Sequence, residues 1–431
     1  MSPMDRAATC TDALGRAYAI RGIRIKALPA IIAIAFALRL WLATLPLRSL
    51  VAHVTPDDAF YYFAIARNIT NGRGVSFDGE VTTNGFHPLW MAIVTICYAL
   101  PSPGIDPMRL ALAVSAAISA VGAIALYRLV EGLTHRKGFA LAGAAVYALH
   151  PAVALQSVNG LETGIALTAL LFCADEFRRT LDGDAPVPWR LGVAGGLLVL
   201  ARTDYALFFV PMLIFVLWKR GVSRAVQAGV VAAAVTAPWF AWSALATGSL
   251  FQTSGEAVPV IVHGSGPHGA DAVPHALRLL RTAWTSDVPA FYLVAPDLHW
   301  WGAVALVCAG LAIAALVVRR RRIDGATGVL MSLAAGVVAL TIAHAGVRWY
   351  FRDWYVPAIL PLLIIAGAVL AASVSDRWQR ATPTGFAMLA LAIGSAASFG
   401  WHEYRNPRYE FQLDMLSAAQ WSRSNTPPDA M

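Results

Sequence analysis

Two adjacent carboxylates, Asp57 and Asp58, begin a polar stretch that lies between long apolar segments. They follow Pro56, which places them in the first turn of a predicted helix, where acidic side chains cap backbone N–H groups and suit the helix dipole. Neighbouring carboxylates also have the chemistry of a general base, or of a site for Mg²⁺, Mn²⁺ or Ca²⁺. We predict that the pair is catalytic. Whether one of the two only caps the helix, and whether a cation binds, stays open.

Aromatic and polar side chains follow the acidic pair in the same stretch. Tyr61 and Tyr62 either stack on a substrate ring or belong to the aromatic belt that membrane proteins place at the lipid–water boundary. Asn84 lies in a TTNG sequence, which is typical of a turn, and His87 follows three residues later. We predict these four as substrate-binding residues, with a purely structural role as the alternative for each.

Two arginines in the last quarter of the chain are spaced so that they could bind one ligand together. Arg348 and Arg352 are four positions apart, so they share one face if the segment is helical. Guanidinium groups match the oxygens of a phosphate. The alternative is that the arginines reach to lipid headgroups and pair with Asp353. We predict phosphate binding by both, with Tyr350 beside them.

Three further charged residues lie at predicted short turns between apolar segments. Glu162 belongs to the sequence NGLET, and Arg202 and Asp204 belong to ARTDY. An ion pair within the protein would account for them, yet ionisable groups near membrane depth are functional candidates by default. We include all three among the predicted substrate-binding residues and leave the choice between the two roles open.

The composition is that of a membrane protein. The 431 residues are 58% apolar and only 13% charged, and the mean hydropathy is +0.60, outside the range of most soluble proteins. The net charge of +8 comes from basic clusters between apolar segments, which indicate membrane topology rather than a nucleic-acid-binding surface. We therefore expect the basic segment 1–27 in the cytoplasm, followed by a retained first span.

The apolar segments predict an all-α polytopic protein with about 11 transmembrane helices. Residues Pro88–Leu100 would reach only about 20 Å as a helix, short of a hydrocarbon core of about 30 Å, so we expect an interfacial or re-entrant helix there. It would belong to a large first outer loop, 47–107, and a second long outer loop is expected at 246–298. The last span and a short outer tail would occupy 376–431. The expected spans are 28–46, 108–130, 139–156, 162–177, a two-helix hairpin at 189–218, 225–244, 300–318, 327–345, 355–373 and 382–400.

Taken together, these motifs resemble the GT-C superfamily of polytopic glycosyltransferases, which use polyprenyl-phosphate sugars. The resemblance rests on the acidic pair after the first span, TNGFHPLW, NGLET, ARTDY and RWYFRDWYVPAILPLL, and covers about residues 28–375. The branch it is similar to contains protein O-mannosyltransferases, the lipid A aminoarabinose transferase and arabinofuranosyltransferases. The resemblance implies a GT-C transmembrane catalytic domain over this range, with interfacial helices in its first outer loop.

The resemblance also implies roles for individual residues. It makes Asp57 the catalytic base and Asp58 its partner, with Arg348 and Arg352 facing the donor phosphate. Glu162 and Arg202 match motif positions of the superfamily. A divalent cation at the acidic pair is left open, because some members work without one.

The expected reaction is inverting transfer of a hexose or pentose from a polyprenyl-phosphate donor to a glycan, lipid or protein of the cell envelope. It would take place at the outer face of the plasma (inner) membrane, with membrane lipid and no nucleic acid as a partner. Only about 30 residues follow the last predicted span, so we expect the loops to recognise the acceptor. Two alternatives are a transporter or flippase of a lipid-linked sugar, and a non-catalytic subunit of envelope glycan assembly.

Overall fold

A computed structural model describes residues 27–100, 104–183, 188–255, 325–347, 353–378 and 409–426. Within these ranges all regular secondary structure is helical, apart from one isolated bridge between Ser76 and Thr82. The prediction of an all-α fold is confirmed for this part of the chain.

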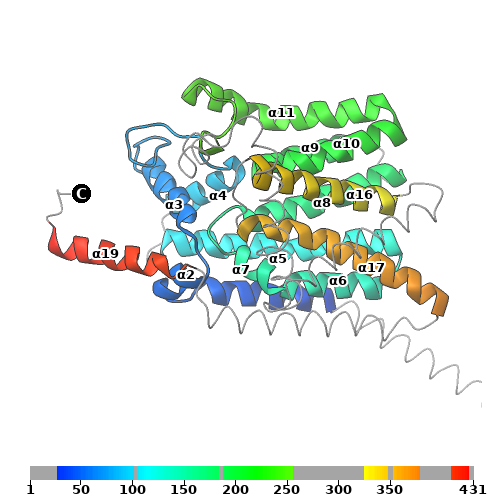
Figure 1. The fold of residues 1–431 in the computed structure, drawn as a ribbon, viewed down its shortest axis with the longest axis horizontal. Helices are drawn as coiled ribbons and strands as arrows, with labels where there is room; N and C mark the ends of the chain where they lie inside the picture. Colours follow the sequence, from blue (N-terminus) through cyan, green and yellow to red (C-terminus); the bar gives the residue numbers. More distant parts are fainter. Residues whose placement is uncertain are drawn as a thin grey trace, which may run out of the picture.

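The long helices lie side by side and form a bundle (Figure 1). Two of them, α5 (Pro107–Thr134) and α8 (Thr163–Asp182), pack against each other. The remaining helices of the bundle are Ala27–Ala43, α6 (Lys137–Leu149), α7 (Pro151–Gln156), α9 (Trp189–Ala201), α10 (Ala206–Arg220), α11 (Val222–Thr247), α16 (Gly325–Thr341) with its π-helical extension η4 (Ile342–Val347), and α17 (Ile359–Trp378), which follows the 3₁₀ turn η5 (Asp353–Ala358).

Four shorter helices gather at one end of the bundle (Figure 1). The acidic pair begins one of them, α3, directly after Pro56, whose extended backbone (φ −69°, ψ 161°) leads into the first turn. The C-terminal helix joins this end through Tyr409, whose backbone N–H donates to the carbonyl of Ala52 over 3.0 Å. The four helices are α2 (Leu47–His53), α3 (Asp57–Thr70), α4 (Pro88–Ala99) and α19 (Phe411–Asn425).

Several helices of the described part are suited to crossing a membrane. Three are long and apolar enough by themselves: Pro107–Thr134, Val222–Thr247 and Gly325–His344. Ala27–Ala43 and α2 would form a fourth span if taken together, although they are bent by 107°. The expected number of about 11 is not established: the described residues hold these three helices, or four with the bent pair, and several shorter apolar helices at other predicted spans. The predicted spans 300–318 and 382–400, like most of loop 246–298, lie outside the described residues.

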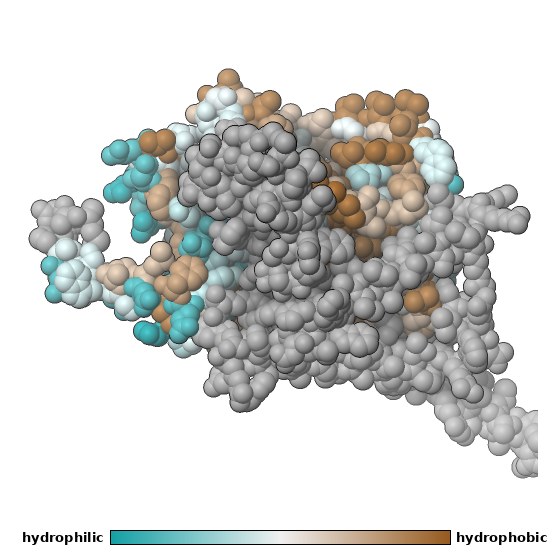
Figure 2. Space-filling model, viewed as in Figure 1, coloured by the Kyte–Doolittle hydropathy of each residue, from teal (hydrophilic) through white to brown (hydrophobic). Residues whose placement is uncertain are grey.

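The surface has the polarity that this arrangement requires (Figure 2). Hydrophobic side chains gather over α10 and α11, whereas hydrophilic ones gather at the end that carries α3. An apolar outer face suits contact with lipid, and the polar end suits water. The exposed apolar residues of α10 and α11 include Val210, Ile214, Leu217, Val226 and Val230.

One predicted span is interrupted. The segment predicted as a single span at 139–156 divides into α6 and α7 at His150. Pro151 has no N–H and cannot continue the helix, and the N–H of Ala152 bonds to Nδ1 of His150 instead of a carbonyl. The carbonyl of Ala148 accepts a hydrogen bond from the buried guanidinium of Arg39 over 2.7 Å. Arg39 therefore satisfies a backbone group that the break releases.

The predicted hairpin at 189–218 is confirmed as two helices that meet at a tight tip. α9 ends at Ala201, and a 3₁₀ turn, η1 (Thr203–Tyr205), leads directly into α10. Arg202 and Asp204 lie at this tip, as the sequence predicts. α4 is a helix of 12 residues, and its position relative to a membrane stays a prediction.

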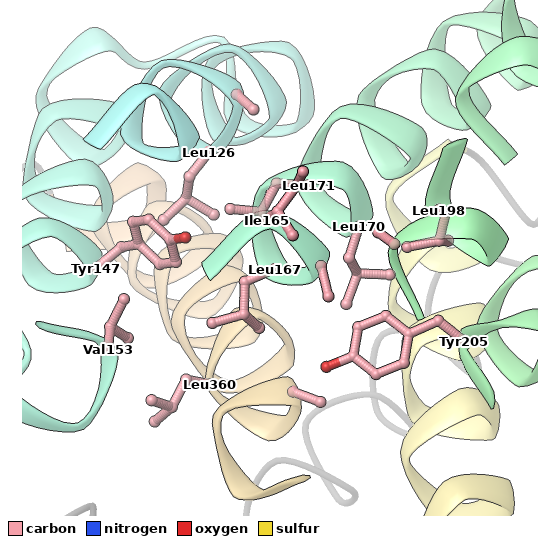
Figure 3. Packing of buried hydrophobic residues seen from close by; sticks show 14 of the residues in the cluster. Leu126, Tyr147, Val153, Ile165, Leu167, Leu170, Leu171, Leu198, Tyr205 and Leu360 are labelled. Atoms are coloured by element: carbon pink, nitrogen blue, oxygen red, sulfur yellow. The ribbon is translucent and has the colours of Figure 1, made fainter. Parts of the chain in front are cut away.

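The core lies where α8 meets its neighbours (Figure 3). Leu167 and Leu170 of α8 are fully buried, with Tyr147 of α6 to one side and Tyr205 of the hairpin tip to the other. The centroid of the Tyr205 ring also lies 5.5 Å from the Arg202 guanidinium, so the apolar core borders the polar groups of the hairpin tip.

Glycines allow α9 and α11 to approach closely. A Cβ at Gly192 would lie 2.6 Å from the backbone oxygen of Ala228, which cannot move aside as a side chain would. We expect Gly192→Ala to destabilise the protein by about 1–3 kcal/mol, the usual cost of overpacking. Gly229→Ala is the matched control, since a Cβ there meets nothing within 4 Å. Thermal unfolding in detergent compares the two; equal melting temperatures would contradict the prediction.

Candidate functional site

A sharp turn after α7 brings the helices α3 and α4 to the start of α8. Gly160 has a left-handed backbone (φ +85°), and a Cβ at this position would lie 2.8 Å from Cβ of Ala59 on α3. The indole N–H of Trp90 on α4 donates to the carbonyl of Gly160 over 2.9 Å. Asn159 stabilises the turn by accepting the N–H of Leu161 over 2.9 Å. Both loop helices, α3 and α4, are therefore held against the turn that precedes α8.

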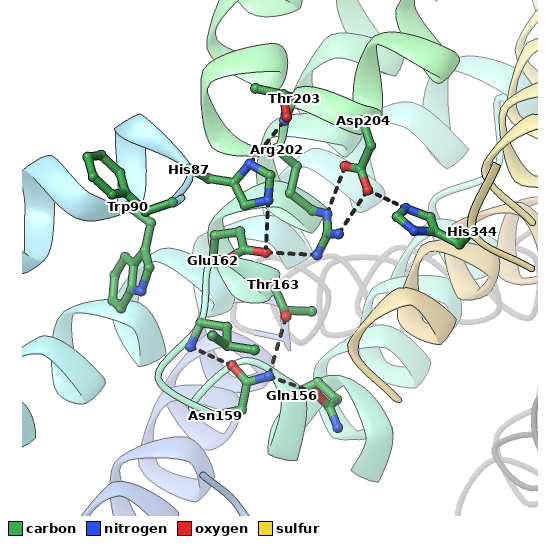
Figure 4. A network of polar contacts seen from close by, with 12 residues as sticks. His87, Trp90, Gln156, Asn159, Glu162, Thr163, Arg202, Thr203, Asp204 and His344 are labelled. Atoms are coloured by element: carbon green, nitrogen blue, oxygen red, sulfur yellow. Dashed lines mark hydrogen bonds and ion pairs between the residues drawn. The ribbon is translucent and has the colours of Figure 1, made fainter. Parts of the chain in front are cut away.

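Glu162, the last residue of this turn, is buried, with 3% of its surface exposed, and its carboxylate contacts three other side chains (Figure 4). Its Oε2 accepts the hydroxyl of Tyr62 over 2.9 Å, which connects it to α3. Its Oε1 accepts Nη1 of Arg202 over 2.8 Å, and Nε2 of His87 lies 3.6 Å from the same oxygen. One carboxylate thus joins α3 to the hairpin tip.

Arg202 extends these contacts to the other side of the hairpin tip. Its Nε and Nη2 donate to the two carboxylate oxygens of Asp204 over 2.9 and 2.8 Å, a paired geometry. Nε2 of His344 lies 2.7 Å from Oδ2 of Asp204 (Figure 4). The ring of Tyr355 stacks on His344 with centroids 3.9 Å apart, and the Arg202 guanidinium lies 4.7 Å from the same ring centroid. We call Tyr62, Glu162, Arg202, Asp204 and His344 the buried cluster.

Burial and neighbouring charges together set the protonation states in the cluster. Burial opposes ionisation of Asp204, but the Arg202 charge and the hydrogen bonds from His344 and Arg202 outweigh it and hold the pKa of the carboxyl well below its usual range. Burial and the neighbouring carboxylate of Glu162 raise the pKa of Tyr62 well above 10, so its hydroxyl stays a donor. Because an ionised carboxylate only accepts, His344 must carry a proton on Nε2.

His87 is held in place through both its backbone and its ring. Its backbone N–H donates to the hydroxyl of Tyr62 over 2.9 Å, and its ring Nδ1 accepts the backbone N–H of Thr203 over 3.2 Å. The imidazole proton of the neutral ring therefore lies on Nε2, directed at Glu162. The position suits orientation of the cluster; direct contact of His87 with a substrate stays a prediction.

Asn84 lies in a structural contact rather than at an open surface. Its side chain is fully buried and donates to the Ser243 hydroxyl over 2.7 Å and to the Phe251 carbonyl over 2.9 Å. Its Oδ1 accepts both the N–H and the hydroxyl of Thr253, over 3.0 and 2.9 Å. Asn84 therefore joins the segment before α4 to the chain beyond α11. Contact of Asn84 with a substrate stays a prediction.

We expect Asn84→Ala to release the segment after α11. The exchange of its backbone amides, 249–255, should increase by roughly tenfold, because losing a buried hydrogen-bonding partner costs about 1–3 kcal/mol. Hydrogen-exchange mass spectrometry checks this. Asn71→Ala is the matched control, since Asn71 is an exposed asparagine in the same loop. An unchanged exchange rate in Asn84→Ala would show that the contact contributes little.

The acidic pair presents two different carboxylates. Asp57 is exposed, and its Oδ1 accepts the N–H of Asp58 over 3.0 Å. Asp58 is half-buried and lies one helical turn before Tyr62, so the two share a face of α3. Tyr61 is half exposed, with its ring centroid 4.7 Å from that of Phe77.

The acidic pair offers two carboxylates to a cation. Among the residues that the structure describes, no group of three or more His, Cys, Asp or Glu side chains could hold a metal ion. Mg²⁺ is commonly held by one or two carboxylates together with waters and substrate phosphates, which Asp57 and Asp58 would fit. A cation at the pair stays a prediction, and we assign no step to it.

Two residues come from outside the predicted set: His344, a member of the cluster, and Tyr355, which stacks on it. His344 lies in a predicted span, and an ionisable residue within an apolar segment was the available signal for it. Tyr355 carries no such signal. The predicted phosphate ligands Arg348, Tyr350 and Arg352 lie outside the described residues.

Comparison with known proteins connects this arrangement to a fold. No family model matches the chain, and no curated protein matches it. Among solved structures, the oligosaccharyltransferase AglB of Archaeoglobus fulgidus, in complex with an inhibitory peptide and a dolichol-phosphate, is similar over 93% of this chain, with a TM-score of 0.54 and 15% identity. ArnT from Cupriavidus metallidurans in its apo state is similar over 87% of this chain, with a TM-score of 0.51 and 13% identity. Both belong to the GT-C superfamily. The chain has the GT-C fold.

The GT-C fold is a polytopic helical membrane fold, as the apolar helices of the bundle require. A second structure of the Archaeoglobus fulgidus enzyme, in complex with Zn and sulfate, is similar with a TM-score of 0.52 and 14% identity over 92% of this chain. The chain spans only 58% and 55% of the two archaeal chains, and 76% of ArnT. The similarity therefore extends over most of this chain but over little more than half of the archaeal chains.

Proposed function

We propose that the protein is an inverting membrane glycosyltransferase that moves a sugar from a polyprenyl-phosphate donor to a cell-envelope acceptor at the extracytoplasmic face. The observation that carries the proposal is the buried cluster, which fixes the acidic helix α3 to the end of an apolar bundle with the GT-C fold. An end of this kind brings a water-exposed carboxylate next to the lipid in which a polyprenyl donor resides.

Asp57 is the proposed general base. A base that takes a proton from an incoming hydroxyl must be accessible to the acceptor, and Asp57 is the exposed member of the pair. The acceptor oxygen then attacks the anomeric carbon, the bond from that carbon to the phosphate oxygen breaks, and the lipid phosphate departs. Direct displacement inverts the configuration at the anomeric carbon.

The donor phosphate is assigned to Arg348 and Arg352. Arg202, another guanidinium among the predicted substrate-binding residues, already donates three hydrogen bonds to Glu162 and Asp204 and is covered by the Tyr355 ring. We therefore propose a positioning role for Arg202. A polyprenyl phosphate partner is supported by the fold of AglB, which has been solved with a dolichol-phosphate.

The test is mass spectrometry of envelope lipids from a deletion strain that carries either the wild-type gene or an empty vector. We expect a polyprenyl-phosphate sugar to accumulate and an envelope glycan to shorten in the deletion strain, with both restored by the wild type. The accumulated mass would identify the donor. Matching lipid and glycan profiles would overturn the proposal. In proteoliposomes, movement of the lipid-linked sugar across the bilayer without bond cleavage would favour the transporter.

A further inference from the structure

His344 belongs to an element remote from the acidic helix, yet a short series of contacts joins the two. His344 lies in η4, at the end of α16, and its Nε2 is 2.7 Å from Asp204. Asp204 is paired with Arg202, Arg202 with Glu162, and Glu162 with Tyr62 on α3. Four polar contacts, none longer than 2.9 Å, thus extend from residue 344 to residue 62.

This series runs through the protein interior. The exposed fractions of the side chains are 2% for His344, 16% for Asp204, 3% for Arg202 and 4% for Glu162. Around His344, Arg202 and Glu162 water has little access, so removing one group leaves the next carboxylate or guanidinium poorly compensated; only Asp204 is partly accessible. The orientation of each member therefore depends on the members on both sides.

Two carboxylates share one guanidinium in the cluster, so each carboxylate also depends on a second donor, His344 for Asp204 and Tyr62 for Glu162. Arg202 directs Nη1 to Glu162 but Nε and Nη2 to Asp204. Nε2 of His344 donates a further hydrogen bond to Asp204, and the hydroxyl of Tyr62 donates one to Glu162. Weakening the contact of Asp204 with His344 leaves Arg202 drawn more strongly to Asp204 and less to Glu162.

We propose that His344 is a positioning residue for the acidic helix α3. By fixing Asp204, it directs Arg202 towards Glu162, and Glu162 then holds Tyr62, one turn beyond Asp58. The consequence for catalysis rests on the function proposed above, whereas the coupling between His344 and α3 does not.

The test compares two replacements of His344 in the full-length protein in detergent micelles. His344→Leu removes the donor, whereas His344→Gln retains an amide N–H where Nε2 lies. Hydrogen-exchange mass spectrometry follows the amides of α3, residues 57–70. We expect exchange there to rise about tenfold in His344→Leu and to return close to the wild-type rate in His344→Gln. Ser332→Ala, a change at a buried hydroxyl earlier in α16, is the control for damage to that helix.

The outcomes separate positioning from simple destabilisation. If His344→Leu increases exchange only in α16 and η4, while α3 retains its protection, the proposal is overturned. Equal effects of His344→Leu and His344→Gln on α3 would also overturn it, because then the N–H has no role. Once a donor is identified, the same variants are assayed for sugar transfer: we expect His344→Leu to lower kcat more than it raises KM. Altered exchange in α3 without any transfer activity in the wild type would contradict the proposed function and leave the coupling standing.

Discussion

Asp57→Asn is expected to lower the rate of sugar transfer by about 10²–10⁴-fold, the range that a positioned general base contributes. The amide has nearly the same shape as the carboxylate and retains an oxygen that can accept the N–H of Asp58, so the start of α3 should be preserved. The measurement is transfer by the purified protein, with the donor identified from the lipids of the deletion strain. Asp58→Asn should cause a smaller loss, since Asp58 is half-buried on the Tyr62 face.

Asp78→Asn is the matched control for these variants. Asp78 is an exposed carboxylate in the segment between α3 and α4, and its Oδ1 accepts the N–H groups of Glu80 and Val81 over 2.8 and 2.9 Å. Its replacement should leave the transfer rate near that of the wild type. If Asp57→Asn retains full activity while Asp58→Asn loses it, the base is Asp58, and Asp57 only caps the helix. Full activity in both variants would remove the catalytic role of the pair.

Arg202→Leu is expected to destabilise the protein by about 3–5 kcal/mol, because removing one partner of a buried ion pair leaves an uncompensated charge. Here two carboxylates, Glu162 and Asp204, lose their shared guanidinium. Thermal unfolding in detergent, followed by intrinsic fluorescence, should show a marked fall in the melting temperature.

Arg190→Leu is the control for loss of an arginine at a surface ion pair. Arg190 pairs with Glu176 over 3.1 Å, but its side chain is 46% exposed, and exposed pairs contribute about 0–1 kcal/mol. The two variants should therefore differ clearly in melting temperature. A similar small effect of both would show that the buried cluster does not determine stability.

The sequence predicts the parts of the site that depend on local signals. Apolar segments bounded by charges define the helices, and the ARTDY motif between two of them places Arg202 and Asp204 at the hairpin tip. The alternative of an ion pair within the protein, left open for Glu162 and the hairpin residues, is what the structure contains. A charged side chain at a turn between apolar segments has few possible partners besides an opposite charge at another such turn. For this reason the sequence alone suggests an ion pair among these residues.

Contacts between distant segments could not be predicted in the same way. TTNG indicates a turn at Asn84, but nothing local indicates that its amide is enclosed by Ser243, Phe251 and Thr253. Tyr355 is one of many aromatic residues in the chain, and its stacking on His344 depends on how α16 and η5 pack. The break between α6 and α7 differs from these, because Pro151 was a visible reason against one continuous helix.

The buried cluster also bears on how the chain assembles. Its members lie at positions 62, 162, 202, 204 and 344, and chains are synthesised from the N-terminus. His344 is synthesised well over a hundred residues after Asp204. During that time Asp204 lacks the hydrogen bond that His344 later donates. The cluster is therefore complete only after the late helices have been made, and a chain truncated before α16 would lack the His344 contact with Asp204.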